Sequence, residues 1–230
     1  MQRLSDKLVN WGTQTEQATL EQAALAASLP FVQPWVSVMA DAHPGKGSTV
    51  GTVIPTNRAI IPAAVGVDIG CGMQAARLAY RAGDIDLQAL RLDILDEIPM
   101  GIGPQGANKE LTLTAMARVD RLSALAKEEY ERYQKNWELQ LGSLGSGNHF
   151  IEVAKDEDNY LWLTLHSGSR GIGKNIAEFH MKQAQKVCDM WHVTLPHRDL
   201  AYFPEGDANF WQYMRVSAGR RHTLGPTETR

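Results

Sequence analysis

The chain has 230 residues, of which 43% are hydrophobic and 21% charged, and its formal net charge is −3 at pH 7. The apolar fraction is enough for a hydrophobic core, in one large domain or two small ones. The weak negative charge removes composition as an argument for nucleic-acid binding, although a local basic patch would still suffice.

The cysteine content and the lengths of the apolar runs indicate the cellular compartment of the protein. The two cysteines, Cys71 and Cys188, do not make a disulfide framework, which indicates a reduced, cytoplasmic protein. No apolar run reaches the length of a transmembrane helix, so we expect no membrane association. The N-terminus also lacks the apolar stretch of a signal peptide.

The first third of the chain predicts one helix followed by short strands. Residues 15–30 contain good helix formers with apolar residues on one face, and the helix is expected to stop at Pro30. Strands are predicted at 35–41 and 50–55, on either side of a glycine-rich turn, and the apolar run 59–67 is also strand-like.

The remainder of the chain alternates helices with one hairpin. Helical spacing is found at 84–99, from about 109 to 137, and again at 173–192. The strand-like segments 149–154 and 160–166 flank KDEDN, which is a hairpin turn signal. This order, without internal repeats or a clear linker, predicts a mixed α+β fold with strands clustered around glycine-rich loops.

Four glycine-flanked polar motifs concentrate the chemically useful side chains. They are DAHPGKG (41–47), DIGCG (68–72), GSGNHF (145–150) and LHSGSRGIG (165–173). Thiolate and imidazole favour borderline transition metals, carboxylate also tolerates manganese, and glycine-rich turns present N–H groups to phosphate oxygens. The inventory therefore suits a metal site beside a phosphate, with Arg170 suited to a bidentate phosphate contact.

Each of these side chains also has a purely structural interpretation. Cys71 is also consistent with a buried, inert thiol, and Asp68 with a turn-capping residue, as is Asp41. A single histidine such as His149 or His166 is more often a structural residue than a ligand. Composition and spacing alone leave the metal site and the structural interpretation both open.

The exact order of residues in these motifs is more informative than their composition. The segment from DAHPGKG to QAARL (41–78) resembles the signature block of the RtcB family of RNA ligases. QLGSLGSGNHFIEV (140–153), LHSGSRGIG (165–173) and DLAYFPEG (199–206) resemble its further blocks. The resemblance extends to about Met214 and rests on long, ordered motifs.

The resemblance implies an RtcB-like α+β fold and a specific reaction. Members of the family join RNA ends that carry a 2′,3′-cyclic phosphate or 3′-phosphate to ends that carry a 5′-hydroxyl, in tRNA splicing or RNA repair. They use GTP and Mn²⁺, with two ions in the complete site. A histidine is first guanylylated, the GMP then activates the RNA 3′-phosphate, and the 5′-hydroxyl attacks.

The same resemblance implies a set of metal ligands. Asp68 and Cys71 match two family ligands, and the thiolate is shared between the two ions. His149 and His166 match two more. On this reading the metals neutralise the triphosphate and its leaving group.

The resemblance also implies nucleotide-binding and catalytic residues. Asn148, His149 and Glu152 match the cofactor-binding set, with Asn148 at the GTP phosphates and Glu152 near the guanine. Arg170 matches an essential arginine that holds a phosphate. Asp41 matches a residue near the metal centre, and Lys46 is only a candidate.

The chain departs from the family pattern in its histidines. Family members continue well beyond this length, and their later part supplies another metal histidine and the guanylylated one. The other histidines here match neither, and two of them lie on the predicted helix 173–192; they are His180, His192, His197 and His222. We therefore expect no nucleophilic histidine, and no self-guanylylation, in this chain.

The final residues depart from the pattern as well. Residues 1–216 match the N-terminal portion of the ligase, whereas 217–230 have no apolar periodicity and are predicted to be a disordered tail. Codons exist for 218–221 and 225–230 that, read two nucleotides later, spell the family segments WAQ and TNRDA in order. This favours a frameshift near Val216, which genomic DNA can test.

Three alternatives to an active ligase remain open from the sequence. The chain is also consistent with a non-catalytic module that retains RNA ends or a metal. A poorly folded remnant with exposed strand edges is a second alternative. A metallohydrolase that uses the same ligands is the third, although Asp41 is its only obvious general base.

Overall fold

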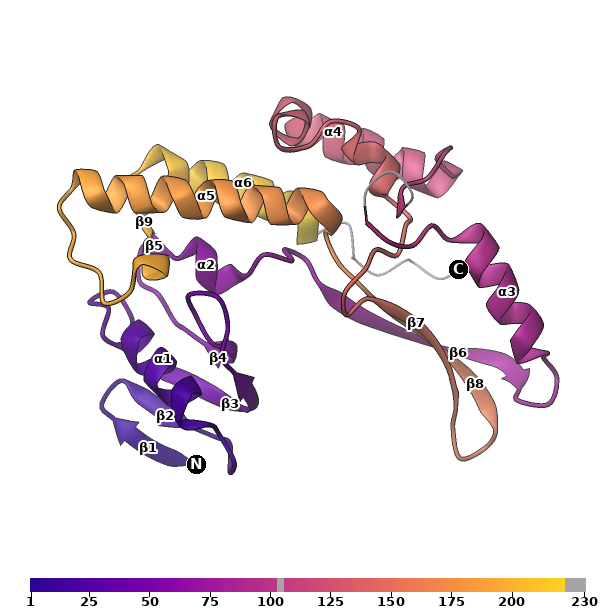
Figure 1. Cartoon of the computed structure of the whole chain (residues 1–230), viewed down its shortest axis with the longest axis horizontal. Helices are drawn as coiled ribbons and strands as arrows, with labels where there is room; N and C mark the ends of the chain where they lie inside the picture. The colour runs from indigo at the N-terminus through magenta and orange to yellow at the C-terminus, as the bar shows by residue number, and fades with distance from the viewer. Residues whose placement is uncertain (103–105, 222–230) are drawn as a thin grey trace. The chain divides into compact units, whose positions relative to one another are not determined.

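The computed structural model describes residues 1–102 and 106–221, and the chain divides into two compact units (Figure 1). One unit contains Met1–Val67 and Ile176–Arg215, and the other contains Asp68–Asn175 and the residues from Val216 onward. The boundary falls inside α5 (Arg170–Met190), so this helix contributes to both units. Each unit is described by itself.

The first unit is built on a four-stranded sheet. Its strands are ordered β1 (Gln2–Ser5), β2 (Leu8–Asn10), β3 (Val36–His43) and β4 (Val50–Val53). The β2–β3 pair is parallel and the other two pairs are antiparallel. Because parallel neighbours need a crossover, α1 (Gln17–Ala27) lies in the connection between β2 and β3.

The core of this unit lies between α1 and the sheet. Ala23, Ala26 and Ala27 are buried, and these small side chains pack in one cluster with Leu8 and Val38 of the strands. The predicted helix at 15–30 is confirmed, but with shorter bounds. Its C-cap residue Ser28 precedes Leu29 and Pro30, and a proline disfavours helical geometry in the residue before it.

The apolar run at 59–67 is a strand only at its start, so that prediction was wrong for the rest. β5 (Ala59–Ile60) pairs with β9 (Phe203–Pro204), and α2 (Pro62–Val65) follows at once. Pro62 occupies the first helical position, where its fixed φ suits a helix and its missing N–H costs nothing. The sequence pattern of apolar residues could not distinguish this single helical turn from a strand.

The later part of the unit is helical and accounts for the unmatched histidines. η3 (Arg198–Leu200) and α6 (Ala208–Arg221) follow α5. His180 is fully buried and its ring lies 4.9 Å from that of Tyr213, whereas His192 is exposed. His197 caps η3 by accepting from the Asp199 N–H at 3.2 Å.

The predicted tail begins inside α6. The structure places 217–221 in the last residues of that helix. Residues 222–230, which include His222, lie outside the described part of the chain.

The second unit contains a three-stranded antiparallel sheet. Its order is β6 (Gly72–Arg81), β8 (Tyr160–Ser167) and β7 (Phe150–Lys155). The predicted hairpin is confirmed, because β7 and β8 pair in register around the turn between them. β6 was missed, because Gly70 and Gly72 suggested a loop that continues past Cys71.

The second unit also contains helices and a helical turn. α3 (Leu87–Glu97) begins after Asp86, whose carboxylate accepts from two N–H groups of the first turn. α4 (Leu113–Tyr133) is capped by Thr112 in the same way, and η2 (Trp137–Gln140) follows. The predicted helices at 84–99 and 109–137 are therefore confirmed, and their caps account for the later starts.

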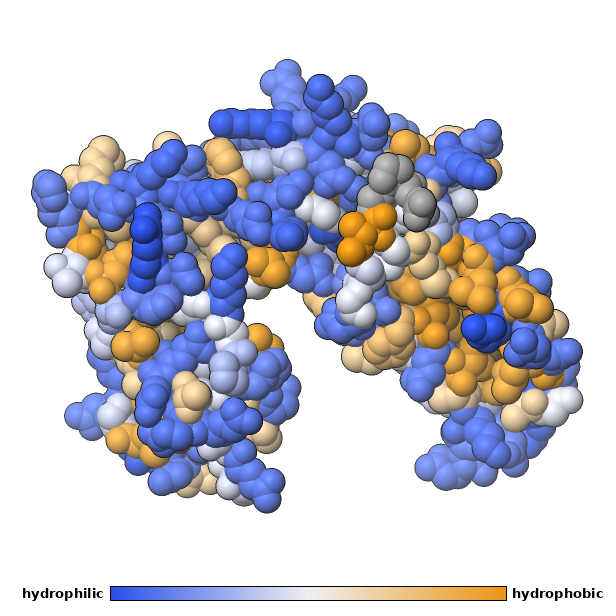
Figure 2. Space-filling view, in the orientation of Figure 1, coloured by the Kyte–Doolittle hydropathy of each residue, from blue (hydrophilic) through white to orange (hydrophobic). Residues whose placement is uncertain are grey.

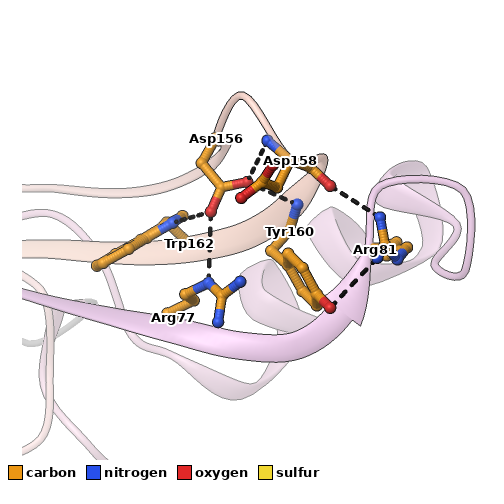
Figure 3. Close-up of polar contacts among 6 residues, drawn as sticks. All are labelled: Arg77, Arg81, Asp156, Asp158, Tyr160 and Trp162. Carbon is orange, nitrogen blue, oxygen red and sulfur yellow. Dashed lines mark hydrogen bonds and ion pairs between the residues drawn. The ribbon is translucent and has the colours of Figure 1, made fainter.

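A polar cluster ties the far end of β6 to the hairpin (Figure 3). Asp156 accepts from Trp162 Nε1–H at 3.0 Å, from Tyr160 N–H at 2.8 Å and from Arg77 Nε–H at 3.4 Å. The Tyr160 ring lies 3.9 Å from the Arg77 guanidinium carbon and 4.4 Å from that of Arg81. These contacts fix the register of the three strands at the end remote from Cys71.

Apolar side chains gather over α3 and the neighbouring sheet, as Figure 2 shows. Leu87, Leu92 and Leu95 of α3 are about half exposed. A cavity of about 290 Å³ lies between α3, η2 and the sheet face that carries Ile151 and Leu165. In the described part of the chain, no helix combines the length and apolar character needed to cross a bilayer.

Candidate metal and phosphate site

A tight turn between the α2 segment and β6 brings a carboxylate and a thiol together. The Cys71 N–H donates to the Asp68 carbonyl at 3.1 Å, which closes the turn. Gly70 has φ +85°, a conformation that glycine adopts without strain. The DIGCG motif therefore puts both side chains at the same end of β6.

The Asp68 carboxylate is held by the loop that precedes α5. Its Oδ1 accepts from the Ser169 N–H at 2.9 Å and from the Ser169 hydroxyl at 3.0 Å, and its Oδ2 lies 2.9 Å from His149 Nε2. Burial raises the pKa of Asp68, but the hydrogen bonds from His149, Ser169 and Cys71 outweigh it and lower the pKa overall. A side chain at Gly168 would collide with this carboxylate.

His149 presents one nitrogen to the site and anchors the other. Its Nδ1 lies 3.0 Å from the Leu144 carbonyl and its Nε2 lies 2.9 Å from the Asp68 carboxylate, and both of these oxygens can only accept. A ring that donates at both nitrogens satisfies both oxygens by itself, whereas a ring that donates at Nδ1 alone leaves the Nε2 lone pair for a metal ion. A proton or a metal ion between the two atoms satisfies this arrangement.

Cys71 completes the group. Its ligand atom and those of Asp68 and His149 all lie within 4.8 Å of one another. His166 of β8 adds a contact, with Nε2 2.9 Å from Cys71 Sγ, but it does not belong to that mutual group. Burial raises the pKa of the Cys71 thiol to about 11, assisted by the hydrogen bond and charge of Asp68.

The donor set fits a metal ion. One thiol, one carboxylate oxygen and one imidazole nitrogen match the ligands of borderline transition metals, and the carboxylate also suits manganese. The Leu144 carbonyl supplies the outer hydrogen bond that a metal-binding histidine requires. The sequence-predicted ligands Asp68, Cys71 and His149 thus lie together, with His166 beside the thiol.

Arg170 lies at the first residue of α5, with a left-handed φ of +60°. Its Nε–H donates to Ser143 Oγ at 3.1 Å, and its Nη2 donates to the carbonyls of Gly101 at 3.1 Å and Gly106 at 2.9 Å. Burial lowers the pKa of Arg170, and the negative charge of Asp68 partly offsets this. Because these three acceptors are neutral, the cation remains available to an anion.

The remaining predicted residues lie on exposed positions. Asn148 is exposed in the loop before β7, and Glu152 is exposed on β7. Glu152 pairs with Thr164 and therefore shares a face of the sheet with His166. Asp41 on β3 and Lys46 in the following turn are exposed, and both belong to the other unit.

Sequence reasoning missed the residues that support the site. Ser169 binds Asp68 and Ser143 binds Arg170, although both serines lie inside motifs already singled out. A nearby glycine was the usable signal for each serine: Gly145, two residues after Ser143, leaves room for Arg170, and Gly168, next to Ser169, leaves room for the Asp68 carboxylate. The Leu144 carbonyl had no sequence signal.

Comparisons with known proteins agree with the motifs. A family model described as tRNA-splicing ligase RtcB matches residues 22–219. An RNA-splicing ligase RtcB of Escherichia coli K12 is 42% identical over 224 residues, which cover 92% of this chain and 55% of that protein.

More distant relatives carry the same description. A tRNA-splicing ligase RtcB of Methanococcus maripaludis is 28% identical over 246 residues, covering 87% of this chain and 51% of that protein. The chain thus spans about half the length of the curated relatives it matches. With a family model over most of its length, the chain belongs to the RtcB family of RNA-splicing ligases.

Proposed function

We propose that the protein acts in RNA ligation, joining a 2′,3′-cyclic phosphate or 3′-phosphate end to a 5′-hydroxyl end with GTP and Mn²⁺, in the cytoplasm. The observation that carries this proposal is the mutual approach of the Asp68, Cys71 and His149 ligand atoms within 4.8 Å. Family membership supports the reaction class, and Arg170 beside this cluster supports a phosphate substrate.

Within the proposed site, Asp68, Cys71, His149 and His166 would hold the metal. A bound metal ion supplies Lewis acidity and neutralises developing negative charge on phosphate oxygens. Arg170 would bind the RNA terminal phosphate, since its charge faces no direct carboxylate partner among the described residues. Asn148 and Glu152 would contact the GTP phosphates and guanine, and Asp41 would act near the reacting groups.

We expect the 230-residue chain by itself not to guanylylate itself. Two of its unmatched histidines have structural placements: His180 is buried and His197 caps a helical turn. Incubation with GTP and Mn²⁺ followed by intact-protein mass measurement tests this. An unchanged mass agrees with the proposal, and a mass raised by one GMP would show that a histidine of this chain is a nucleophile.

A second candidate is a non-catalytic module that binds RNA ends and a metal. It is favoured by the fact that the three ligand residues and Arg170 all belong to one compact unit. Binding of a fluorescent RNA with a 3′-phosphate, compared with the same RNA ending in a 3′-hydroxyl, tests the function that both candidates share. A preference for the phosphate that disappears in Arg170→Ala supports it, and equal binding of both RNAs contradicts it.

A further inference from the structure

The side chain of Arg170 is immobilised by partners that contribute no charge. Its Nε–H donates to Ser143 Oγ, and its Nη2 donates to two backbone carbonyls. Ser143 is 7% exposed, and its own hydroxyl donates to the Gln140 carbonyl at 2.7 Å. That donation leaves the oxygen lone pairs directed to Arg170, so the serine acts as an oriented acceptor.

The two carbonyls are also fixed in place. The Gly101 N–H donates to the Gly145 carbonyl at 2.8 Å, which ties Gly101 to the GSGNHF loop. Two residues after Gly106, the Asn108 side chain donates to the carbonyls of Leu139 at 3.1 Å and Leu141 at 2.6 Å. The acceptors around the guanidinium therefore belong to a connected frame.

This frame determines which edge of the guanidinium is left for a ligand. Nη1 takes no part in these three hydrogen bonds, and it approaches Gly145 so closely that a side chain there would collide with it. A Cβ atom on Gly145 would also lie 2.8 Å from His149 Nδ1. The Nη1 edge therefore lies beside the histidine of the metal-ligand group.

We propose that Ser143 is a positioning residue for Arg170. By accepting from Nε, it holds the guanidinium so that the Nη1 edge is available for the terminal phosphate of an RNA. A neutral hydroxyl suits this role, because a carboxylate at the same position would neutralise the cation and compete with the phosphate. This inference rests on the proposed function, in which Arg170 binds that phosphate.

The positioning can be measured without any ligand. In protein labelled with ¹⁵N-arginine, the Arg170 Nε–H resonance is assigned by its absence in Arg170→Lys. Loss of the acceptor in Ser143→Ala is expected to speed hydrogen exchange of this group at least about tenfold. Ser146→Ala is the matched control, because Ser146 lies in the same loop and is exposed. Unchanged exchange in Ser143→Ala would overturn the inference.

The functional part uses the same variants with two single-stranded RNAs that differ only in a 3′-phosphate or 3′-hydroxyl. We expect Ser143→Ala to reduce the preference for the phosphate about tenfold, and Ser146→Ala to leave it unchanged. A wild-type preference that Ser143→Ala does not alter overturns this inference and leaves the proposed function standing. A wild-type protein without any preference overturns the proposed function, and the phosphate role of Ser143 with it.

Discussion

Asp68 Oδ2 and His149 Nε2 lie 2.9 Å apart, and the other ring nitrogen of His149 is occupied by the Leu144 carbonyl at 3.0 Å. The carboxylate and the imidazole thus lie close enough together to be neighbouring ligands of one cation. Cys71 Sγ lies within 4.8 Å of both ligand atoms. The predictions about metal binding follow from this arrangement.

Removal of the Cys71 sulfur should abolish the thiolate signature of a bound metal. Cobalt(II) bound to thiolate has a charge-transfer absorption band in the near ultraviolet, so wild-type protein titrated with cobalt should show it. Cys71→Ala should lose the band and bind cobalt at least about tenfold more weakly. Cys188→Ala is the control, because Cys188 is buried on α5, where it donates to the Tyr202 carbonyl. A band that persists in Cys71→Ala would contradict the site.

The affinity for metal should rise with pH. The pKa of the Cys71 thiol is raised to about 11, so at neutral pH the thiol is protonated and a metal must displace its proton. Asp68, with its lowered pKa, is already ionised and adds no dependence in this range. Between pH 7 and 9 we expect the affinity for cobalt to increase by up to about tenfold per pH unit from this thiol. Titrations at several pH values measure it, and a flat profile would count against Cys71 as a ligand.

Gly145→Ala should displace the Arg170 guanidinium from its present position. Gly145 has φ +101°, so alanine there is strained by about 1–3 kcal/mol, and its methyl group would also collide with Arg170 Nη1. Gly147→Ala is a matched control, because Gly147 has φ +82° but nothing within 4 Å of the added methyl group. Both variants should lose stability in urea denaturation, but only Gly145→Ala should also lose the preference for 3′-phosphorylated RNA. Equal losses of preference would contradict the role of the collision.

Asp156→Asn should weaken the hairpin end of the sheet in a pH-dependent way. The hydrogen bond from Trp162, opposed by burial and assisted by Tyr160 and Arg77, lowers the pKa of Asp156 below 3.8. A lowered folded-state pKa stabilises the fold above the unfolded-state value, and this contribution disappears as pH falls through the folded-state pKa. At pH 6 we therefore expect Asp156→Asn to lower Tm by a few degrees, with the difference from wild type closing below pH 3.8.

The control for this experiment is Asp158→Asn. It makes the same change of charge in the same turn, but Asp158 contributes only its backbone to the contacts drawn in Figure 3. Its Tm should stay close to that of wild type at both pH values. If both variants melt alike, the net charge of the turn rather than the bonded carboxylate stabilises the hairpin.

Gln22→Ala should destabilise the first unit through the DAHPGKG turn. The Gln22 side chain donates to the Gly45 carbonyl at 2.6 Å and accepts from the Gly45 N–H at 3.0 Å. It therefore satisfies both backbone polar groups of Gly45. We expect a loss of about 1–2 kcal/mol in the free energy of unfolding, measured in urea. Gln17→Ala, on the same helix but with a side chain that donates to exposed Glu21, should cost less than about 0.5 kcal/mol.

The sequence predicted elements whose signals are local. The hairpin followed from KDEDN between two strand-like segments, and the helical spacing at 84–99 predicted α3, although not its start after Asp86. β6 was missed because the flanking glycines imply irregular backbone, whereas its strand geometry comes from pairing with β8, whose partner residues lie 79 to 95 positions later in the chain. Pairing of that kind leaves no local pattern.

The residues of the candidate site also divide into those with a local sequence signal and those without one. Asp68, Cys71 and His149 were predicted from motif wording, and the structure brings them together. The acceptors of Arg170 were not predicted, because two are backbone carbonyls that any residue type could supply, more than sixty residues from the arginine. The roles of Asn148 and Glu152 remain predictions, as does that of Asp41.

The position of β6 at the edge of its sheet has a consequence for handling the protein. Among the described residues β6 pairs only with β8, so β6 is an edge strand of its sheet. The charges of Arg77 and Arg81 disfavour the addition of another strand to the far half of β6. The half that starts at Gly72 has no charged residue before Arg77. At high concentration the protein should therefore self-associate by adding a strand of a second molecule to β6 next to Cys71. Ala75→Lys should slow this self-association, because it places a charge on that half of the strand.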